Sequence, residues 1–86
     1  MEIFLERYPK IDLHGMDRDS ARMVTNDFVY ENYVLGNDVI VIIHGIGKGI
    51  VKKEVHEALR VNKYVSEYKT DNFNDGCTVV RLKKYP

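Results

Sequence analysis

The sequence is poor in cysteine and has no long apolar run. Its one cysteine, Cys77, cannot form an internal disulfide, which excludes a disulfide-stabilised secreted scaffold and favours a reducing, cytoplasmic compartment. The longest uninterrupted apolar stretch, 39–43, is too short for a membrane-spanning helix. No basic segment followed by an apolar stretch opens the chain. We therefore expect neither a signal peptide nor a membrane partner.

A strong net charge is also absent. The 86 residues carry 13 basic and 13 acidic side chains, so the domain-wide basic excess typical of many nucleic-acid-binding domains is excluded. The basic side chains nevertheless concentrate in the second half of the chain. A local basic patch there would consist of Lys48, Lys52, Lys53, Arg60 and Lys63. The alternative is that these side chains only solvate a helix face, and composition alone favours that alternative.

Length and an apolar content of 44% predict one small folded domain over residues 11–86, expected to stand alone, preceded by a leading segment over 1–10. Apolar alternation and β-branched runs predict strands, and 3.6-residue spacing between capping residues predicts helices. The expected strands are 11–14, 39–43, 65–68 and 77–82, and the expected helices are 18–35 and 50–61.

The order β-α-β-α-β-β predicts an α+β fold, a two-layer sandwich with a four-stranded mixed sheet and both helices on one face. Right-handed crossovers place the two helices on the same side of such a sheet. The strand 39–43 is apolar on both faces, so its second face needs a cover. Two alternatives remain for what packs on this face: the leading segment with Ile3, Phe4 and Leu5, or a second copy of the chain in a homodimer.

Two His-Gly dipeptides, 14–15 and 44–45, end the first two predicted strands. If these strands are parallel, both dipeptides lie at the sheet edge where open α/β sheets bind ligands. Asp12 and His14 then leave the same strand face, where the carboxylate can orient the ring and favour its charged form. We interpret Asp12, His14 and His44 as candidate catalytic residues for proton transfer. The alternative is that Asp12 caps a backbone group and His14 is merely polar.

A glycine-rich loop, Gly45-Ile46-Gly47-Lys48-Gly49, connects the second strand to the second helix. Backbone N–H groups and the positive end of the helix dipole favour an anion there, and phosphate is the expected ligand. The candidate phosphate-binding residues are Gly45, Gly47, Lys48, Gly49, Lys52 and Lys53. The loop matches neither the Walker A nor the GxGxxG pattern, so a flexible turn that needs positive φ is the alternative.

The sequence predicts neither a structural metal site nor a catalytic role for the remaining histidine and the cysteine. No spaced Cys/His set is present, so no structural metal site is predicted, although a magnesium ion bridging a phosphate stays open. The segment 56–60 fails the HExxH pattern because Arg60 stands at the second histidine position. His56 is expected to be solvated, and Cys77 to be a buried, inert thiol.

Three segments in order, Ile11-Asp12-Leu13-His14-Gly15, 42–49 and 76–82, resemble the Smr (small MutS-related) domain over about residues 10–83. The resemblance implies a two-layer sandwich akin to the C-terminal domain of bacterial translation initiation factor three. It also implies a nucleic-acid-associated module, several members of which are endonucleases. It places an LDxH-type motif on Asp12 and His14, and an HGxGxG-type motif on His44, Gly45, Gly47 and Gly49. The chain departs at 72–76, where many relatives have a longer glycine-rich loop.

Two kinds of function stay open. The first is an endonuclease that holds a phosphate at the glycine-rich loop, moves a proton with His14, and stabilises charge with His44 and Lys48. The nucleophile would be the 2′-OH on RNA, or water with a metal on DNA. The second is a module without catalysis that binds nucleic acid or another protein. Only Tyr64 lies within the basic stretch, so the sequence gives little support to base stacking.

Overall fold

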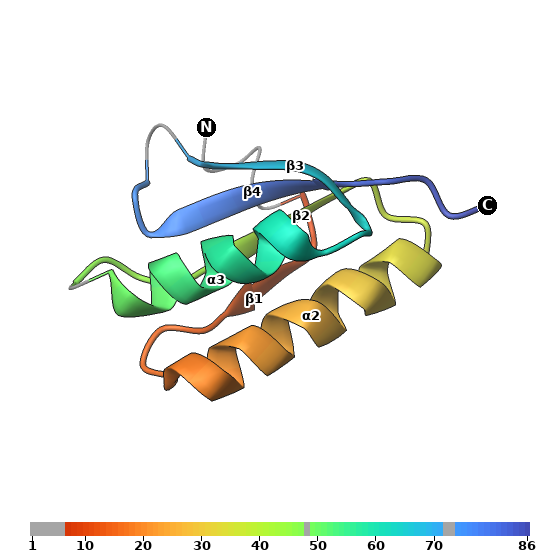
Figure 1. Cartoon of the computed structure of the whole chain (residues 1–86). Coiled ribbons are helices and arrows are strands. Elements are labelled where there is room, and N and C mark those ends of the chain that lie inside the picture. Colours follow the sequence, from red (N-terminus) through yellow and green to blue (C-terminus); the bar gives the residue numbers. More distant parts are fainter. Residues whose placement is uncertain (1–6, 48, 72–73) are drawn as a thin grey trace.

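The protein forms a two-layer α+β sandwich in the computed structural model, which describes residues 7–47, 49–71 and 74–86. In chain order the elements are β1 (Lys10–Asp12), α2 (Arg18–Val34), β2 (Val39–Ile43), α3 (Ile50–Val61), β3 (Val65–Thr70) and β4 (Cys77–Leu82). The strands form one sheet in the order β1-β2-β4-β3, and both helices cover the same face of it (Figure 1). The predicted fold is confirmed.

The pairing of the strands brings two loops to one edge of the sheet. β1 is parallel to β2, with Ile11 opposite Ile42, whereas β4 is antiparallel to both β2 and β3. The carboxyl ends of β1 and β2 therefore lie side by side. The turns that follow these two strands, together with the first turns of the two helices, surround this edge.

β1 is shorter than the strand expected over 11–14, because a turn begins at its last residue. The carboxylate of Asp12 accepts a hydrogen bond from the backbone N–H of His14 at 3.1 Å, a local contact that bends the chain. Leu13 still donates its N–H to the carbonyl of Ile43 at 2.7 Å, so the chain leaves β2 only after Leu13.

The two helices start differently. Asp17 is the N-cap of α2, and its side chain accepts the N–H of Ser20 at 2.7 Å and so satisfies one of the unpaired amides of the first turn. Gly49 is the N-cap of α3; it has a φ of 80° and offers no side chain as a cap. In the described part of the chain, neither helix is long and apolar enough to cross a membrane.

The core lies between the helices and the sheet. Its most buried members, all aliphatic, are Leu13, Ala21, Val29, Ile40, Ile42, Val55, Leu59, Val80 and Leu82. Val41 alternates to the opposite face and is only 1% exposed, and a hollow of about 260 Å³ on that face is lined by Tyr8, Val39 and Val79 among others. The expected cover by Ile3, Phe4 and Leu5 lies outside the described residues, and a homodimer through this face stays a prediction.

Candidate functional site

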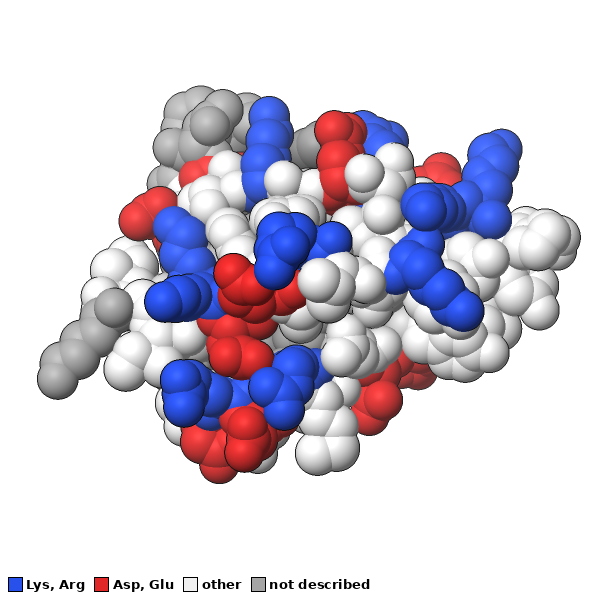
Figure 2. Space-filling view, in the orientation of Figure 1, with Lys and Arg blue, Asp and Glu red and all other residues white. Residues whose placement is uncertain are grey.

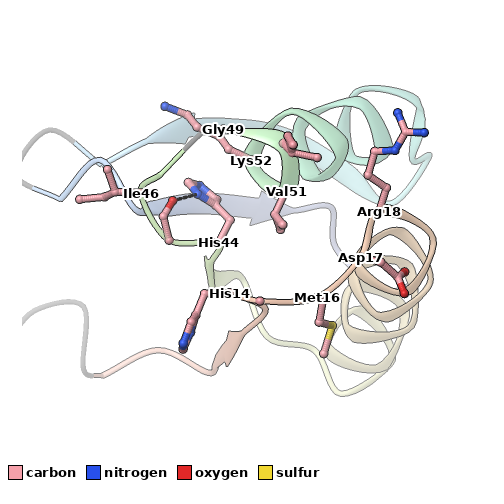
Figure 3. Close-up of a pocket in the computed structure, with 12 residues that line it drawn as sticks. His14, Met16, Asp17, Arg18, His44, Ile46, Gly49, Val51 and Lys52 are labelled. Carbon is pink, nitrogen blue, oxygen red and sulfur yellow. Dashed lines mark hydrogen bonds between the residues drawn. The ribbon is translucent and has the colours of Figure 1, made fainter.

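A pocket of about 680 Å³ opens at the sheet edge where β1 and β2 end (Figure 3). The turn after β1, the loop after β2 and the first turns of both helices form its walls. Its lining residues are His14, Gly15, Met16, Asp17, Arg18, His44, Gly45, Ile46, Gly49, Ile50, Val51 and Lys52. The two His-Gly dipeptides thus meet at one edge, because β1 and β2 are parallel.

Asp12 and His14 form an exposed acid–imidazole pair beside this pocket. Oδ1 of Asp12 lies 2.6 Å from Nδ1 of His14, and the side chains of His14 and Asp12 are 71% and 51% exposed. The hydrogen bond with the imidazole, followed by that from the backbone N–H of His14, lowers the pKa of Asp12. An ionised carboxylate only accepts, so Nδ1 carries the proton and Nε2 is the basic nitrogen of the neutral ring. Nε2 is therefore the atom that can take a proton from a bound ligand.

Gly45 packs directly against His14. A Cβ atom on Gly45 would lie 3.0 Å from Cβ of His14, and the φ of Gly45 is +82°. The carbonyl of Gly76 accepts the N–H groups of both His44 and Gly45, at 2.9 and 3.0 Å. Gly45 therefore supports the position of His14. Its N–H is already bonded, so it is not a free amide for phosphate, which differs from the expectation for Gly45.

The first turn of α3 offers the amides that Gly45 does not. The first backbone bond of this helix runs from the N–H of Lys53 to the carbonyl of Gly49 at 2.9 Å, so the amides of 50–52 precede it. A Cβ atom on Gly47 or Gly49 would meet no atom of the surrounding structure within 4 Å. These two glycines are thus required by their positive φ and leave the approach to the helix open.

The basic residues are divided between the pocket and the surface around it. Lys52 lines the pocket, and its Nζ lies 3.3 Å from Oδ1 of Asp75. Lys53 is exposed and is not among the lining residues, while Lys48 lies outside the described residues. Sequence reasoning missed Arg18, which lies at the pocket rim on the first residue of α2 (Figure 3). A cation at a helix start opposes the dipole, and this could have drawn attention to it.

His44 lies at the base of the pocket, where both of its ring nitrogens are bonded. The residue is 3% exposed, and Nδ1 donates to the carbonyl of Gly45 at 3.1 Å, which leaves Nε2 as the acceptor for the hydroxyl of Thr78 at 2.7 Å. Burial is the main cause that lowers the pKa of His44. His44 is therefore a neutral, internally bonded ring, which differs from the expected direct contact with developing charge.

His56 extends the same hydrogen-bonded chain. Its Nε2 donates to the hydroxyl of Thr78 at 2.7 Å, and burial, followed by the proximity of His44, lowers its pKa. The expectation that His56 is solvated is wrong, because α3 turns this residue towards β4 and it is only partly exposed. The three side chains His44, Thr78 and His56 are called the His–Thr–His chain below.

No metal centre is visible in residues 7–47, 49–71 and 74–86, where no three His, Cys, Asp or Glu side chains gather closely enough to hold an ion. Cys77 is buried, as expected, and burial followed by the charge of Asp71 raises the pKa of its thiol. This keeps the thiol protonated and fits an inert role.

Fold and site together define a small α+β domain with an acid–imidazole pair and a glycine turn at one sheet edge. The family model of the Smr domain matches residues 11–83, and the chain belongs to this family. Its resemblance to the family in three segments is therefore confirmed.

Two curated relatives contain the matching segment within a much longer chain. Identity is 36% over 76 residues with endonuclease MutS2 of Clostridium acetobutylicum, which covers 85% of this chain and 10% of that protein. Identity is also 36% over 77 residues with endonuclease MutS2 of Clostridium tetani, which covers 86% and 10%. The chain thus spans about a tenth of the length of these relatives.

Two crystal structures share the fold. The Smr domain of Thermus thermophilus MutS2 aligns with a TM-score of 0.84 at 28% identity, which covers 87% of this chain and 98% of that domain. YdaL of Escherichia coli, a stand-alone small MutS-related protein, aligns with a TM-score of 0.83 at 25% identity, which covers 90% of this chain and 68% of YdaL.

Proposed function

We propose that this domain is an endonuclease that cleaves nucleic-acid phosphodiesters at the pocket between β1, β2 and the two helix starts. The observation that carries the proposal is the exposed ring of His14, a residue that lines the pocket, bonded through Nδ1 to Asp12 at 2.6 Å. Similarity to proteins named endonuclease MutS2 supports this class of activity. The 680 Å³ of the pocket is within the usual range for sites that bind small molecules or single nucleotides.

In the proposed reaction, His14 is the general base. On RNA, its Nε2 removes the proton of the 2′-OH, the oxygen attacks phosphorus, the bond to the 5′ oxygen breaks, and water protonates the departing oxygen. On DNA, the ring takes the proton of an attacking water instead. Asp12 keeps the ring in the tautomer that has Nε2 free and stabilises the imidazolium that forms.

The phosphate lies against the start of α3 in this proposal. The amides of 50–52 and the helix dipole stabilise its charge, and Lys52 and Arg18 add cations at the pocket wall. Lys48 is proposed to add a further charge from the loop. His44 supports this arrangement from beneath, because it bonds to the carbonyl of Gly45, which packs on His14.

Magnesium would find few protein ligands here. Asp12 is the one carboxylate of the proposed catalytic pair, and it is engaged by His14. A magnesium ion would therefore be held mainly by substrate phosphates and water, as is common for this ion. The proton transfer proposed for His14 and Asp12 is the same with or without such an ion, and attack by water on DNA is the step that would use it.

The test is cleavage of labelled single-stranded RNA, duplex DNA and branched DNA, each with and without magnesium. We expect His14→Ala to abolish cleavage and Asp12→Asn to reduce it by about 10²-fold or more, the usual size of an acid–base contribution. Both positions are exposed, so circular dichroism and thermal unfolding should match the parent. Equal cleavage by parent and variants would assign the activity to a contaminating nuclease and overturn the proposal.

Binding without cleavage is the second candidate function. One observation favours it: both ring nitrogens of His44 are bonded within the protein, so His14 is the one imidazole at the pocket, among the described residues, with a basic nitrogen for a ligand. Affinity for nucleic acid that falls steeply with salt, together with no cleavage under any of the conditions above, would establish this alternative.

A further inference from the structure

Four tyrosines gather at the far end of the two helices from the pocket. Tyr30 and Tyr33 lie on the last turns of α2, Tyr64 lies in the turn between α3 and β3, and Tyr85 follows β4. The ring centroids of Tyr33 and Tyr64 are 4.4 Å apart, those of Tyr30 and Tyr64 are 5.3 Å apart, and those of Tyr33 and Tyr85 are 5.3 Å apart. These four side chains are called the tyrosine platform.

Two of the four platform side chains are about half exposed to solvent. Tyr33 and Tyr64 pack against the core, whereas Tyr30 is 51% and Tyr85 is 53% exposed. Each exposed ring packs against a half-buried one, Tyr30 against Tyr64 and Tyr85 against Tyr33. The exposed rings are therefore already ordered, and they lose little rotamer freedom when a ligand binds. Such preorganised aromatic surface is typical of binding sites.

The charge beside the platform is positive. Nζ of Lys63 lies 5.4 Å from the centre of the Tyr64 ring, and the backbone N–H of Lys83 donates to the carbonyl of Tyr64 at 2.9 Å. Lys84 follows, and all three lysines are exposed. Figure 2 shows Lys and Arg side chains clustered at the right-hand end of this face, beside uncoloured side chains.

The acidic residues at this end of α2 point to another side. One edge of α2 faces the α3–β3 turn. On this edge Tyr33 contacts Tyr64, and Asn26 accepts a hydrogen bond from Asn62. At about 100° per residue, Glu31 and Asp27 both lie beyond Tyr30, on the side of α2 away from this edge. The platform therefore faces the lysines without a carboxylate of α2 between them.

We propose that the tyrosine platform binds single-stranded nucleic acid, DNA or RNA, by stacking bases on Tyr30 and Tyr85 while Lys63, Lys83 and Lys84 contact phosphates. Aromatic faces flanked by cations are the combination that single strands recognise, because every base has a face to stack and every nucleotide carries a charge. An interface between two copies of the chain would be expected to have fewer lysines at its centre.

The inference rests on the proposed function and extends it to the form of the substrate. Tyr30 is twelve residues along α2 from Arg18 at the pocket rim, which corresponds to about 18 Å of helix. A substrate cleaved in the pocket would therefore carry a single-stranded segment that reaches this second contact. Nucleic acid that is duplex throughout would not use it.

Fluorescence anisotropy with labelled 15-nucleotide oligo(dT) and oligo(U) tests the proposal, with all proteins in the His14→Ala background so that no probe is cleaved. We expect Tyr30→Ala/Tyr85→Ala to weaken binding of at least one probe about tenfold, and the matched Tyr30→Phe/Tyr85→Phe variant, which keeps both rings, to stay within about twofold. Lys63→Gln/Lys83→Gln/Lys84→Gln should lower the slope of log affinity against log salt by about 2. Comparison of the two probes separates DNA from RNA.

Unchanged affinity of the alanine variant for both probes would overturn the proposal, as would an equal loss in the phenylalanine variant, which would assign the effect to the hydroxyl groups. A parent that dimerises in light scattering, binds neither probe and becomes monomeric with Tyr30→Ala/Tyr85→Ala would make the platform an interface between copies. Tyrosine-dependent binding by a protein that cleaves nothing would retain this inference and remove the proposed nuclease.

Discussion

His44 and His56 share one hydroxyl: His56 donates to Oγ1 of Thr78 at 2.7 Å, and the same hydroxyl donates to His44 at 2.7 Å. Because the carbonyl of Gly45 accepts from the other nitrogen of His44, the direction of every bond in the His–Thr–His chain is fixed. The chain joins α3 and β4 to the loop after β2. It therefore links the core of the domain to the floor of the pocket.

The first prediction concerns Thr78. Thr78→Val keeps the shape of the side chain but leaves a donor of His56 and an acceptor of His44 without partners, which should lower the free energy of unfolding by about 2–4 kcal/mol. Thr78→Ser is the matched control, because it keeps the hydroxyl and loses only a methyl group, worth about 1 kcal/mol. Urea unfolding measures both. A serine variant as unstable as the valine variant would assign the effect to packing.

The second prediction concerns pH. Burial lowers the pKa of His44 and His56 below the ordinary value of 6.5, so the unfolded chain binds more protons than the folded one below that pH. The contribution of both rings to stability is fully present above pH 6.5 and is lost as the pH falls through 6.5 towards the lowered values. We expect the free energy of unfolding to decrease between pH 7 and pH 5.

The control for this pH effect is His56→Gln, whose amide can still donate to Thr78 but does not titrate. Its free energy of unfolding should depend less steeply on pH over the same range, measured by urea unfolding at each pH. A parent whose stability stays constant from pH 7 to pH 5, or a variant with the parent's slope, would contradict the prediction.

The third prediction separates backbone strain from contact at the glycine turn. Gly45→Ala places a methyl group 3.0 Å from Cβ of His14 at a φ of +82°, whereas Gly47→Ala meets no atom within 4 Å at a φ of +97°. Both should lose about 1–2 kcal/mol of stability from the left-handed backbone. Only Gly45→Ala should also displace His14 and reduce cleavage about tenfold or more at equal folded fraction. Equal activity of the two folded variants would show that the contact with His14 is not needed.

The fourth prediction concerns the ion pair at the pocket wall. Lys52 lies 3.3 Å from Asp75, whose side chain is largely exposed, so the pair is worth less than about 1 kcal/mol. Asp75→Asn frees Lys52 for phosphate and should strengthen binding of a labelled DNA duplex up to about fivefold at low salt, whereas Lys52→Gln should weaken it. The measurement is fluorescence anisotropy. Unchanged affinity in Lys52→Gln would remove this lysine from the phosphate site.

The parts of the fold that depend on local pattern could be predicted from the sequence. The β-branched run 39–43 and the capped helix after Asp17 have strong local signals, and the parallel pairing of β1 with β2 follows from the connecting helix. The turn at Asp12 was not predicted, because a two-residue hydrogen bond to His14 replaced the last expected strand residues. Residue alternation alone does not distinguish these two outcomes.

The parts of the site that depend on distant segments could not be predicted. The N–H of Gly45 is bonded to Gly76, and His56 is bonded to Thr78, so both depend on where β4 lies. The tyrosine platform likewise needs Tyr85 to return to α2 after β4. No periodicity within one segment contains this information.

Gly76 has a further consequence for how this domain varies. Its single carbonyl accepts the two amides that follow β2, and its own N–H donates to the side chain of Asn74 at 2.9 Å, so these bonds need no residue between Asp71 and Asn74. Evolution can therefore lengthen the chain between Asp71 and Asn74 while His14 keeps its place. The connection is a natural point for inserting new specificity.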